Sequence, residues 1–331
     1  EETAARTGNV VGLLKWSVRT WLDYAASSYT ITLVIESVAF MLLAYGPPTW
    51  TRLAGAAASV FVGTAGFASC LLAWPLGALA IAIRRDARWR LRTAVWLGIG
   101  IVVGVAYVRG LVHPEGLPPP APIFTSPVAA LRVAYGLCLA LGMPVWYVFS
   151  PFSEGARGAT VILPLIGIAG IALAMWLVWL HVRRDGLRRP DVWLFPALLV
   201  AFAVAACGIT AVGRVPLGLH AMTASRYIAF TALFWVGLVM LLTTASPCRT
   251  RAWRRASLVL AGLIVAAGLR GWADSLPQWE RMHRDGILGR DALLRRDFAH
   301  TRDVFPVAPV LDERREVLSR LHLSIFRRGV H

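Results

Sequence analysis

Long apolar segments alternate along the chain with short arginine-rich ones. Apolar segments that contain no Asp, Glu, Lys or Arg include Leu53–Ile83, Gly158–Val182, Val192–Gly213 and Tyr227–Cys248. Each is long enough for the ~20 residues that cross a bilayer as a helix. The pattern predicts an all-α, polytopic helical membrane protein with about seven spans. The expected spans lie near residues 29–46, 53–83, 91–109, 160–182, 192–213, 227–246 and 256–270.

Arginine clusters within residues 84–92, 183–189 and 249–255 predict the orientation of these spans. Short arginine-rich loops stay cytoplasmic, so we expect all three clusters on that side. Three apolar segments separate the first two clusters, and three crossings would place these clusters on opposite sides. We therefore expect the segment 128–149, which carries Arg132 and is interrupted by Gly142-Met143-Pro144, to be re-entrant or interfacial. An eight-span arrangement that departs from the charge rule is the alternative.

The spans divide the chain into three regions. Residues 1–28 are expected to form an amphipathic cytoplasmic lead, residues 29–270 a transmembrane helical bundle, and residues 271–331 a small extracytoplasmic C-terminal tail. The tail differs in composition, since it holds nine of the 18 acidic residues and 11 of the 34 basic ones. The turn 46–52 and the segment 214–226 are also expected outside the cytoplasm.

Composition narrows the class of protein further. Hydrophobic residues make up 57% of the chain and charged residues 16%, whereas soluble domains carry about 25% charge. The net charge of +16 comes from arginine clusters between apolar segments, which favours membrane topology over nucleic-acid binding. The four cysteines lack the spacing of a metal site or a disulfide framework, so no metal site is predicted. The chain also lacks the GxxxxGK[ST], HExxH and GxSxG motifs.

Glu36 is the most isolated charge, because no other charged residue lies between Asp23 and Arg52. It falls in the middle of the first expected span. An ionisable side chain at that depth is costly and commonly functional. The alternative is a protonated carboxyl group that bonds a neighbouring helix. Glu36 is therefore a weak candidate for a catalytic residue.

A second group of candidates joins two spans. Two arginines beside His and Tyr at the mouth of a bundle can clamp a phosphate through charge-assisted, often bidentate hydrogen bonds. Arginines at the ends of spans also commonly extend toward the membrane surface instead, so both interpretations stay open. The candidate phosphate-binding residues are Arg214, His220, Ser225, Arg226 and Tyr227.

Several short patterns carry a resemblance to a known family. They are Trp74-Pro75-Leu76-Gly77 before Arg84-Arg85, Leu141-Gly142-Met143-Pro144, Gly213-Arg214, Ala224-Ser225-Arg226-Tyr227, Phe234-Trp235-Val236-Gly237-Leu238 and the tail segment 321–326. From about residue 30 onward, the chain resembles the C-terminal part of an uncharacterised family of bacterial polytopic membrane proteins. That family is loosely similar to the C-type glycosyltransferases, which use polyprenyl-phosphate sugars on the extracytoplasmic face.

The resemblance implies a multi-pass protein of the bacterial inner membrane that takes part in lipid-linked-sugar transfer during cell-envelope biogenesis. Arg214 and Arg226 would bind the donor phosphate, and Trp146 and Tyr147 would line the groove for the lipid or sugar. The broader family carries acidic residues in its first extracytoplasmic loop as a base or as metal ligands, which would imply a divalent metal. The corresponding turn 46–52 of this chain contains no acid.

That departure leaves two interpretations. The chain begins with Glu1 rather than Met, and in the first interpretation it is a fragment that lacks the catalytic acidic loop. In the second, it is a non-catalytic membrane subunit or scaffold of a larger complex. Membrane lipid is an expected partner in both, together with a polyprenyl-phosphate sugar in the first and other membrane subunits in the second.

Overall fold

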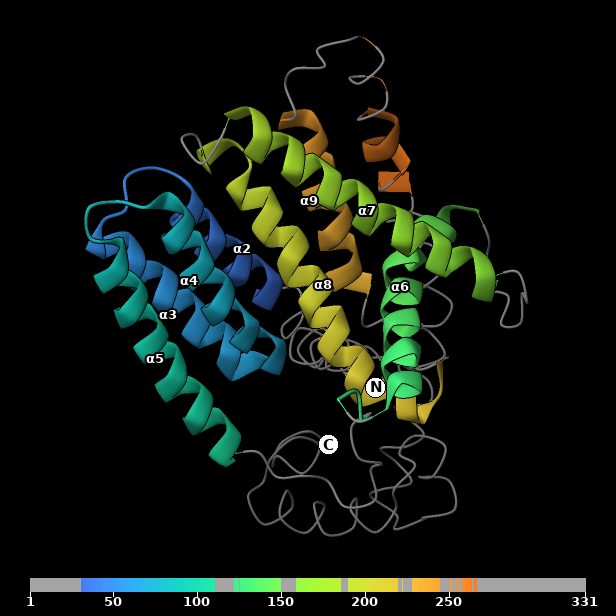
Figure 1. Cartoon of the computed structure of the whole chain (residues 1–331), viewed down its shortest axis with the longest axis horizontal. Coiled ribbons are helices and arrows are strands. Elements are labelled where there is room, and N and C mark those ends of the chain that lie inside the picture. The colour runs from blue at the N-terminus through green and yellow to red at the C-terminus, as the bar shows by residue number, and fades with distance from the viewer. Residues whose placement is uncertain are drawn as a thin grey trace, which may run out of the picture. The chain divides into compact units, whose positions relative to one another are not determined.

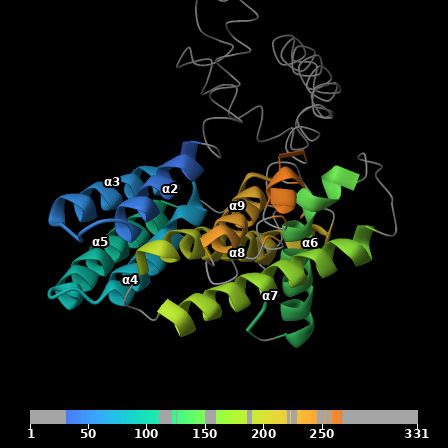
Figure 2. The ribbon, with the colours of Figure 1, turned by 90° about the horizontal axis from the view of Figure 1, so that it is seen from above.

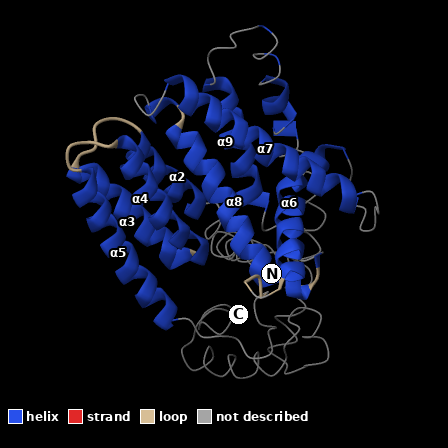
Figure 3. Ribbon diagram, viewed as in Figure 1, coloured by secondary structure: helices blue, strands red, loops and turns tan. Residues whose placement is uncertain are grey.

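A computed structural model describes residues 31–110, 122–124, 126–149, 159–185, 190–219, 222, 228–244, 251, 255, 258–263 and 265–266. All of these residues belong to one compact unit, Tyr24–Arg270. The described part of the chain consists of helices and contains no strand (Figures 1 and 3). Helices α2–α5 form one group and helices α6–α9 lie beside it as a second (Figure 2). The predicted all-α fold is therefore confirmed for these residues.

The first group begins with α2 (Ile31–Ala44) and α3 (Trp50–Gly66), which form an antiparallel hairpin. Thr49 begins α3, because its side chain accepts a hydrogen bond of 3.3 Å from the Arg52 amide. The extended backbone of Phe67 ends the helix. The short 3-10 helix η2 (Ala68–Leu72) then leads into α4 (Ala73–Arg84), and α5 (Trp89–Gly110) follows.

Helices α3 and α4 run in opposite directions, so the prediction of a single span over residues 53–83 is wrong. Arg84, at the end of α4, returns to the end of α2, where its guanidinium donates to the carbonyls of Leu43, at 2.8 Å, and Gly46. Both ends of the segment 50–84 thus lie at the same end of the unit. The apolar pattern did not reveal the reversal, because residues 66–72 are themselves mostly apolar.

The second group contains α6 (Pro127–Phe149), α7 (Ala159–Asp185), α8 (Leu194–Arg214) and α9 (Ile228–Thr244), with the short 3-10 helices η4 (Pro190–Val192) and η5 (Val215–Leu217) flanking α8. Two glycines set the spacing of α6 and α7. A Cβ atom at Gly142 would collide with the Leu163 carbonyl, and one at Gly167 would collide with the Cys138 carbonyl. Small residues of this kind let membrane helices approach closely.

Helix α6 is continuous, so the predicted interruption at Gly142-Met143-Pro144 is wrong. Gly142 allows α7 to pack closely against α6 and does not interrupt the helix. Pro144 lies inside the helix. The carbonyl of Leu141 accepts a hydrogen bond of 2.8 Å from Trp235 Nε1 of α9. The irregular backbone that suggested a re-entrant segment is therefore absent from α6.

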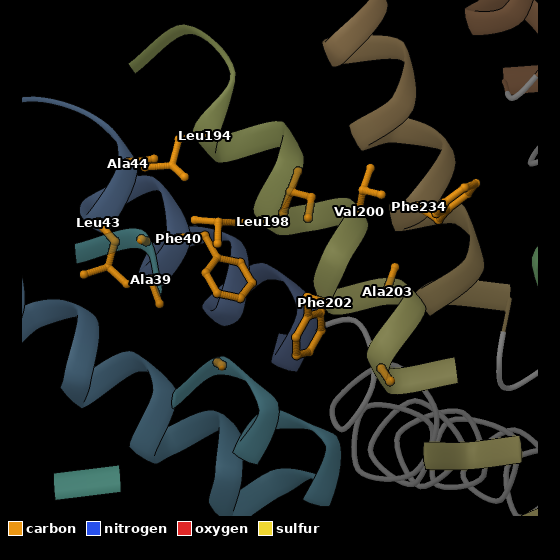
Figure 4. Close-up of a cluster of buried hydrophobic side chains, with 14 of the residues drawn as sticks. Ala39, Phe40, Leu43, Ala44, Leu194, Leu198, Val200, Phe202, Ala203 and Phe234 are labelled. Atoms are coloured by element: carbon orange, nitrogen blue, oxygen red, sulfur yellow. The ribbon is translucent and has the colours of Figure 1, made fainter. Parts of the chain in front are cut away.

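The two groups meet where α2 packs against α8. The rings of Phe40 and Phe202 lie edge to face with centroids 5.6 Å apart, and those of Tyr45 and Phe195 lie 5.5 Å apart. These pairs show that α2 and α8 are antiparallel. Leucine and alanine side chains from both helices fill the space around Phe40 and Phe202 (Figure 4).

The apolar surface of the helices indicates a membrane-embedded protein. Val102 is 69% exposed and Leu131 is 72% exposed, as expected for side chains that face lipid. Four described helices are long and apolar enough to cross a membrane, and they are Trp89–Arg109, Pro127–Val145, Val161–Arg184 and Leu194–Arg214. The segments Thr32–Ala44, Ala68–Arg84 and Phe230–Thr244 are shorter apolar helices. Residues 1–28 and 271–331, for which a lead and a tail were predicted, lie outside the described residues.

Candidate functional site

The described helices have two ends that differ in charge. One, here named the arginine end, carries Arg52, Arg84, Arg85, Arg88, Arg90, Arg92, Arg183 and Arg184. At this end, the last residue of α4 contacts the chain just before α8, because Nη2 of Arg84 lies 3.2 Å from Oδ1 of Asp191. The opposite end carries three described arginines, which are Arg109, Arg132 and Arg214.

The arginine end brings together two of the predicted arginine clusters. The Arg84–Asp191 pair places the end of α4 beside the chain that follows α7. The hydroxyl of Thr244, the last residue of α9, lies 3.5 Å from Nε2 of His181 in α7, so α9 also ends at the arginine end. The structure thus places the first two clusters at one end of the described helices.

The turn 46–52 also lies at the arginine end, contrary to prediction. Arg52 Nε donates a hydrogen bond of 3.3 Å to the Leu42 carbonyl, and Arg84 bonds the Gly46 carbonyl. The guanidinium of Arg92 stacks over the Trp50 ring, 5.4 Å from its centroid. The expectation that this turn and the cluster 84–92 face opposite sides is therefore wrong, because α3 and α4 form a hairpin.

At the opposite end, Arg214 ends α8 where α6 packs against it. A Cβ atom at Gly136 of α6 would lie 2.9 Å from Cγ2 of Val215 and 3.4 Å from Cγ of Met222. Val133 and Met222 belong to a separate small buried cluster at this contact. The end of α8, where the predicted phosphate-binding segment begins, thus packs against α6. Helix α6 also carries Trp146 and Tyr147, which were predicted to line the groove.

The other candidates of this site are less fully described. His220, Ser225, Arg226 and Tyr227 lie outside the described residues. Trp146 and Tyr147 belong to the helical backbone of α6, but their side chains lie outside the description. Arg214 is half-buried, and no ion pair among the described residues involves it.

Arg132 is a cation at this end that sequence reasoning did not select for binding. It is exposed, and it precedes Gly136 by one helical turn, so it lies on the face of α6 that meets the end of α8. Guanidinium groups from two packed helices therefore stand at one end of the bundle. The four-residue spacing is visible in the sequence, but the contact between α6 and residues 211–222 is not.

Glu36 lies in a different environment, fully buried in α2 at 0% exposure. A Cβ atom at Gly63 of α3 would collide with Glu36 Oε1 and would lie 3.4 Å from Sγ of Cys70 in η2. The thiol of Cys70 is thus next to the carboxyl group. Neither carboxyl oxygen has a nitrogen or oxygen partner among the described residues, and the same holds for the hydroxyl of the adjacent Ser69.

The structure does not bring Glu36 together with Arg214. Glu36 is enclosed by α2, α3 and η2, whereas Arg214 lies against α6 in the second group. The Glu36 side chain is fully buried, and no contact between it and Arg214 is found among the described residues. Among the described residues, no three His, Cys, Asp or Glu side chains come together as potential metal ligands. No family model, curated protein or solved structure matches this chain.

Proposed function

We propose that this protein is an integral membrane protein that binds a polyprenyl-phosphate sugar as part of a lipid-linked-sugar glycosyltransferase of the bacterial cell envelope. The observation that carries the proposal is the packing of α6 on the end of α8 and on Met222. This packing brings Arg132 to the same end of the described helices as Arg214, the residue that the family resemblance implies as a ligand of the donor phosphate. Paired guanidinium groups are well suited to bidentate recognition of phosphate.

A polyprenyl phosphate requires an apolar surface for its chain and cations for its headgroup, and α6 offers both. Val128 is 61% exposed and Leu131 is 72% exposed, and both lie within one turn of Arg132. In the proposed complex, the isoprenoid chain lies along these side chains in the membrane. The phosphate lies between Arg132 and Arg214.

The length of α8 supports a site on the extracytoplasmic side. Its 21 residues span about 32 Å at 1.5 Å per residue, which matches a hydrocarbon core of about 30 Å. Asp191 and Arg84 lie at its first end and Arg214 at its last. If the arginine end is cytoplasmic, as the charge rule predicts, Arg214 faces the side where C-type enzymes use their donor.

The described residues supply donor binding rather than acceptor activation. Glu36 is buried elsewhere, and the described arginines at the opposite end have no carboxylate beside them that could act as a base. In the proposal, the base and any divalent metal are supplied by residues outside the described segments or by another chain. The role of this chain is to hold the phosphate and orient the sugar.

Binding of a polyprenyl monophosphate to the purified protein in detergent tests the proposal. Each of Arg132→Ala and Arg214→Ala should weaken binding by about 10- to 100-fold, because a hydrogen bond to a charged group is worth about 1.5–3 kcal/mol. Arg109→Ala, at the same end but on α5, is the control and should bind as the wild type does. Native mass spectrometry measures the bound fraction, and unchanged binding in both variants would contradict the proposal.

A non-catalytic membrane subunit is the second candidate, and the surface of α5 favours it. Helix α5 is mostly exposed along Trp89–Arg109, and a Cβ placed at Gly98 or Gly104 would meet no neighbouring helix within 4 Å. Such an open helix suits packing against another membrane helix. For a subunit, native mass spectrometry should show a stoichiometric complex that Gly98→Leu and Gly104→Leu disrupt. A single chain in both samples would argue against it.

A further inference from the structure

Five exposed arginines lie at the arginine end, in two groups from parts of the chain that are distant in sequence. Arg85, Arg88 and Arg90 lie around the turn between α4 and α5, and Arg183 and Arg184 lie in the last turn of α7. The Arg84–Asp191 ion pair joins these two regions. In Figure 1, the start of α5 and the end of α7 both lie toward the upper left.

The acidic side chains described at this end are paired with other arginines. Asp191 pairs with Arg84 at 3.2 Å, and Asp86 pairs with Arg92. Arg84 and Arg92 are shielded, with side chains only 10% and 11% exposed, and Arg84 also bonds the end of α2. Arg84 and Arg92 form the ion pairs with these two acids. The five exposed arginines have no ion pair with the acidic side chains that the structure describes.

Two of the five cations lie over tryptophan rings. The guanidinium of Arg90 lies 5.5 Å from the Trp89 ring centroid, and that of Arg183 lies 5.0 Å from the Trp179 ring centroid. Trp179 is 50% exposed. Tryptophan is enriched at the level of the lipid headgroups, and a guanidinium beside such a ring lies at the depth of the lipid phosphates.

We propose that the five exposed arginines form a docking surface for the phosphate groups of acidic phospholipids. The guanidinium groups have N–H donors that suit bidentate bonds to phosphate oxygens, and a group of positive charges favours lipids with a net negative charge over zwitterionic ones. This surface is at the other end of the bundle from Arg132 and Arg214. It is therefore independent of the proposed donor site, and either proposal can fail without the other.

Lipid selection by the purified full chain tests this inference. The protein is equilibrated in mixed micelles with equal amounts of phosphatidylglycerol and phosphatidylcholine, and native mass spectrometry counts the retained lipids of each kind. The wild type should retain phosphatidylglycerol preferentially. The preference should fall by about fivefold for each exposed arginine removed, as in Arg88→Gln and Arg90→Gln. It should also fall as salt rises, because exposed charges are screened.

Arg109→Gln is the matched control, since Arg109 is an exposed arginine at the other end of the same helix, α5. It removes the same charge and should leave the preference unchanged. The quadruple variant Arg88→Gln, Arg90→Gln, Arg183→Gln and Arg184→Gln should lose most of the preference, because only Arg85 of the five remains. If it aggregates, the single variants still decide the question. A preference that persists in the variants, or that Arg109→Gln lowers equally, would overturn the proposal.

Discussion

At the scale of single residues, Gly63 is constrained by the side chain that faces it. The Glu36 carboxyl occupies the space where a Cβ atom at residue 63 would lie, and Sγ of Cys70 would lie 3.4 Å from that atom. We expect Gly63→Ala to lower the free energy of unfolding by about 1–3 kcal/mol, because the buried carboxyl must shift within a packed interior. Unfolding of the purified protein with sodium dodecyl sulfate in mixed micelles measures this loss.

A double-mutant cycle separates this clash from a general effect of the substitution. In a Glu36→Ala background the space is empty, so Gly63→Ala should cost much less there than in the wild type. Gly104→Ala, in the open part of α5, should be neutral or stabilising by up to about 1 kcal/mol. Equal costs of Gly63→Ala in both backgrounds would show that Glu36 is not the neighbour that matters.

Individual residues also show what the sequence could reveal about the candidate sites. The burial of Glu36 follows from its isolation in an apolar segment, and Arg214 lies at a helix end as its position after an apolar segment suggests. Arg132 was interpreted as a sign of a re-entrant segment. Its place beside α8 depends on the contact between Gly136 and Val215, which joins segments far apart in the chain. No local pattern encodes such a contact.

At the scale of helices, the contact of α6 with α7 depends on two glycines that face backbone atoms. The Cβ of an alanine at residue 142 or 167 would meet a carbonyl group, which cannot rotate away as a side chain can. We expect Gly142→Ala and Gly167→Ala each to cost about 3 kcal/mol, the upper end of the usual range for overpacking. Unfolding in mixed micelles gives the values. Gly208→Ala in α8, with nothing within 4 Å, is the control, and a similar cost there would contradict this explanation.

The same helices show why apolar patterning predicted some elements and missed others. Helices α5, α7 and α8 are close to the expected spans, because a long apolar segment flanked by arginines can satisfy its backbone in a membrane only as a helix. The pattern failed at residues 66–72, where η2 reverses the chain inside the protein. A reversal covered by other helices needs no polar residues to solvate it, so apolar composition does not distinguish it from a continuous helix.

At the scale of the whole molecule, this reversal changes how charge is distributed between the two ends. A single span over residues 53–83 would place the turn 46–52 and the cluster 84–92 on opposite sides of the membrane. The hairpin of α3 and α4 instead places them together, with Arg84 bonded to both Leu43 and Gly46. Arg52 therefore lies at the arginine end. Helix α5 begins at this end and reaches Arg109 at the opposite end.

Labelling of single cysteines in sealed vesicles tests this topology. In a background in which the four native cysteines are replaced by alanine, Pro48→Cys and Arg88→Cys should react with a membrane-impermeant maleimide from the same side. Arg109→Cys should react from the other side, because α5 is long enough to cross the membrane between Arg88 and Arg109. A permeant maleimide that labels all three variants controls for accessibility. If Pro48→Cys reacts from the side of Arg109→Cys, segment 53–83 crosses the membrane once, and the hairpin is wrong.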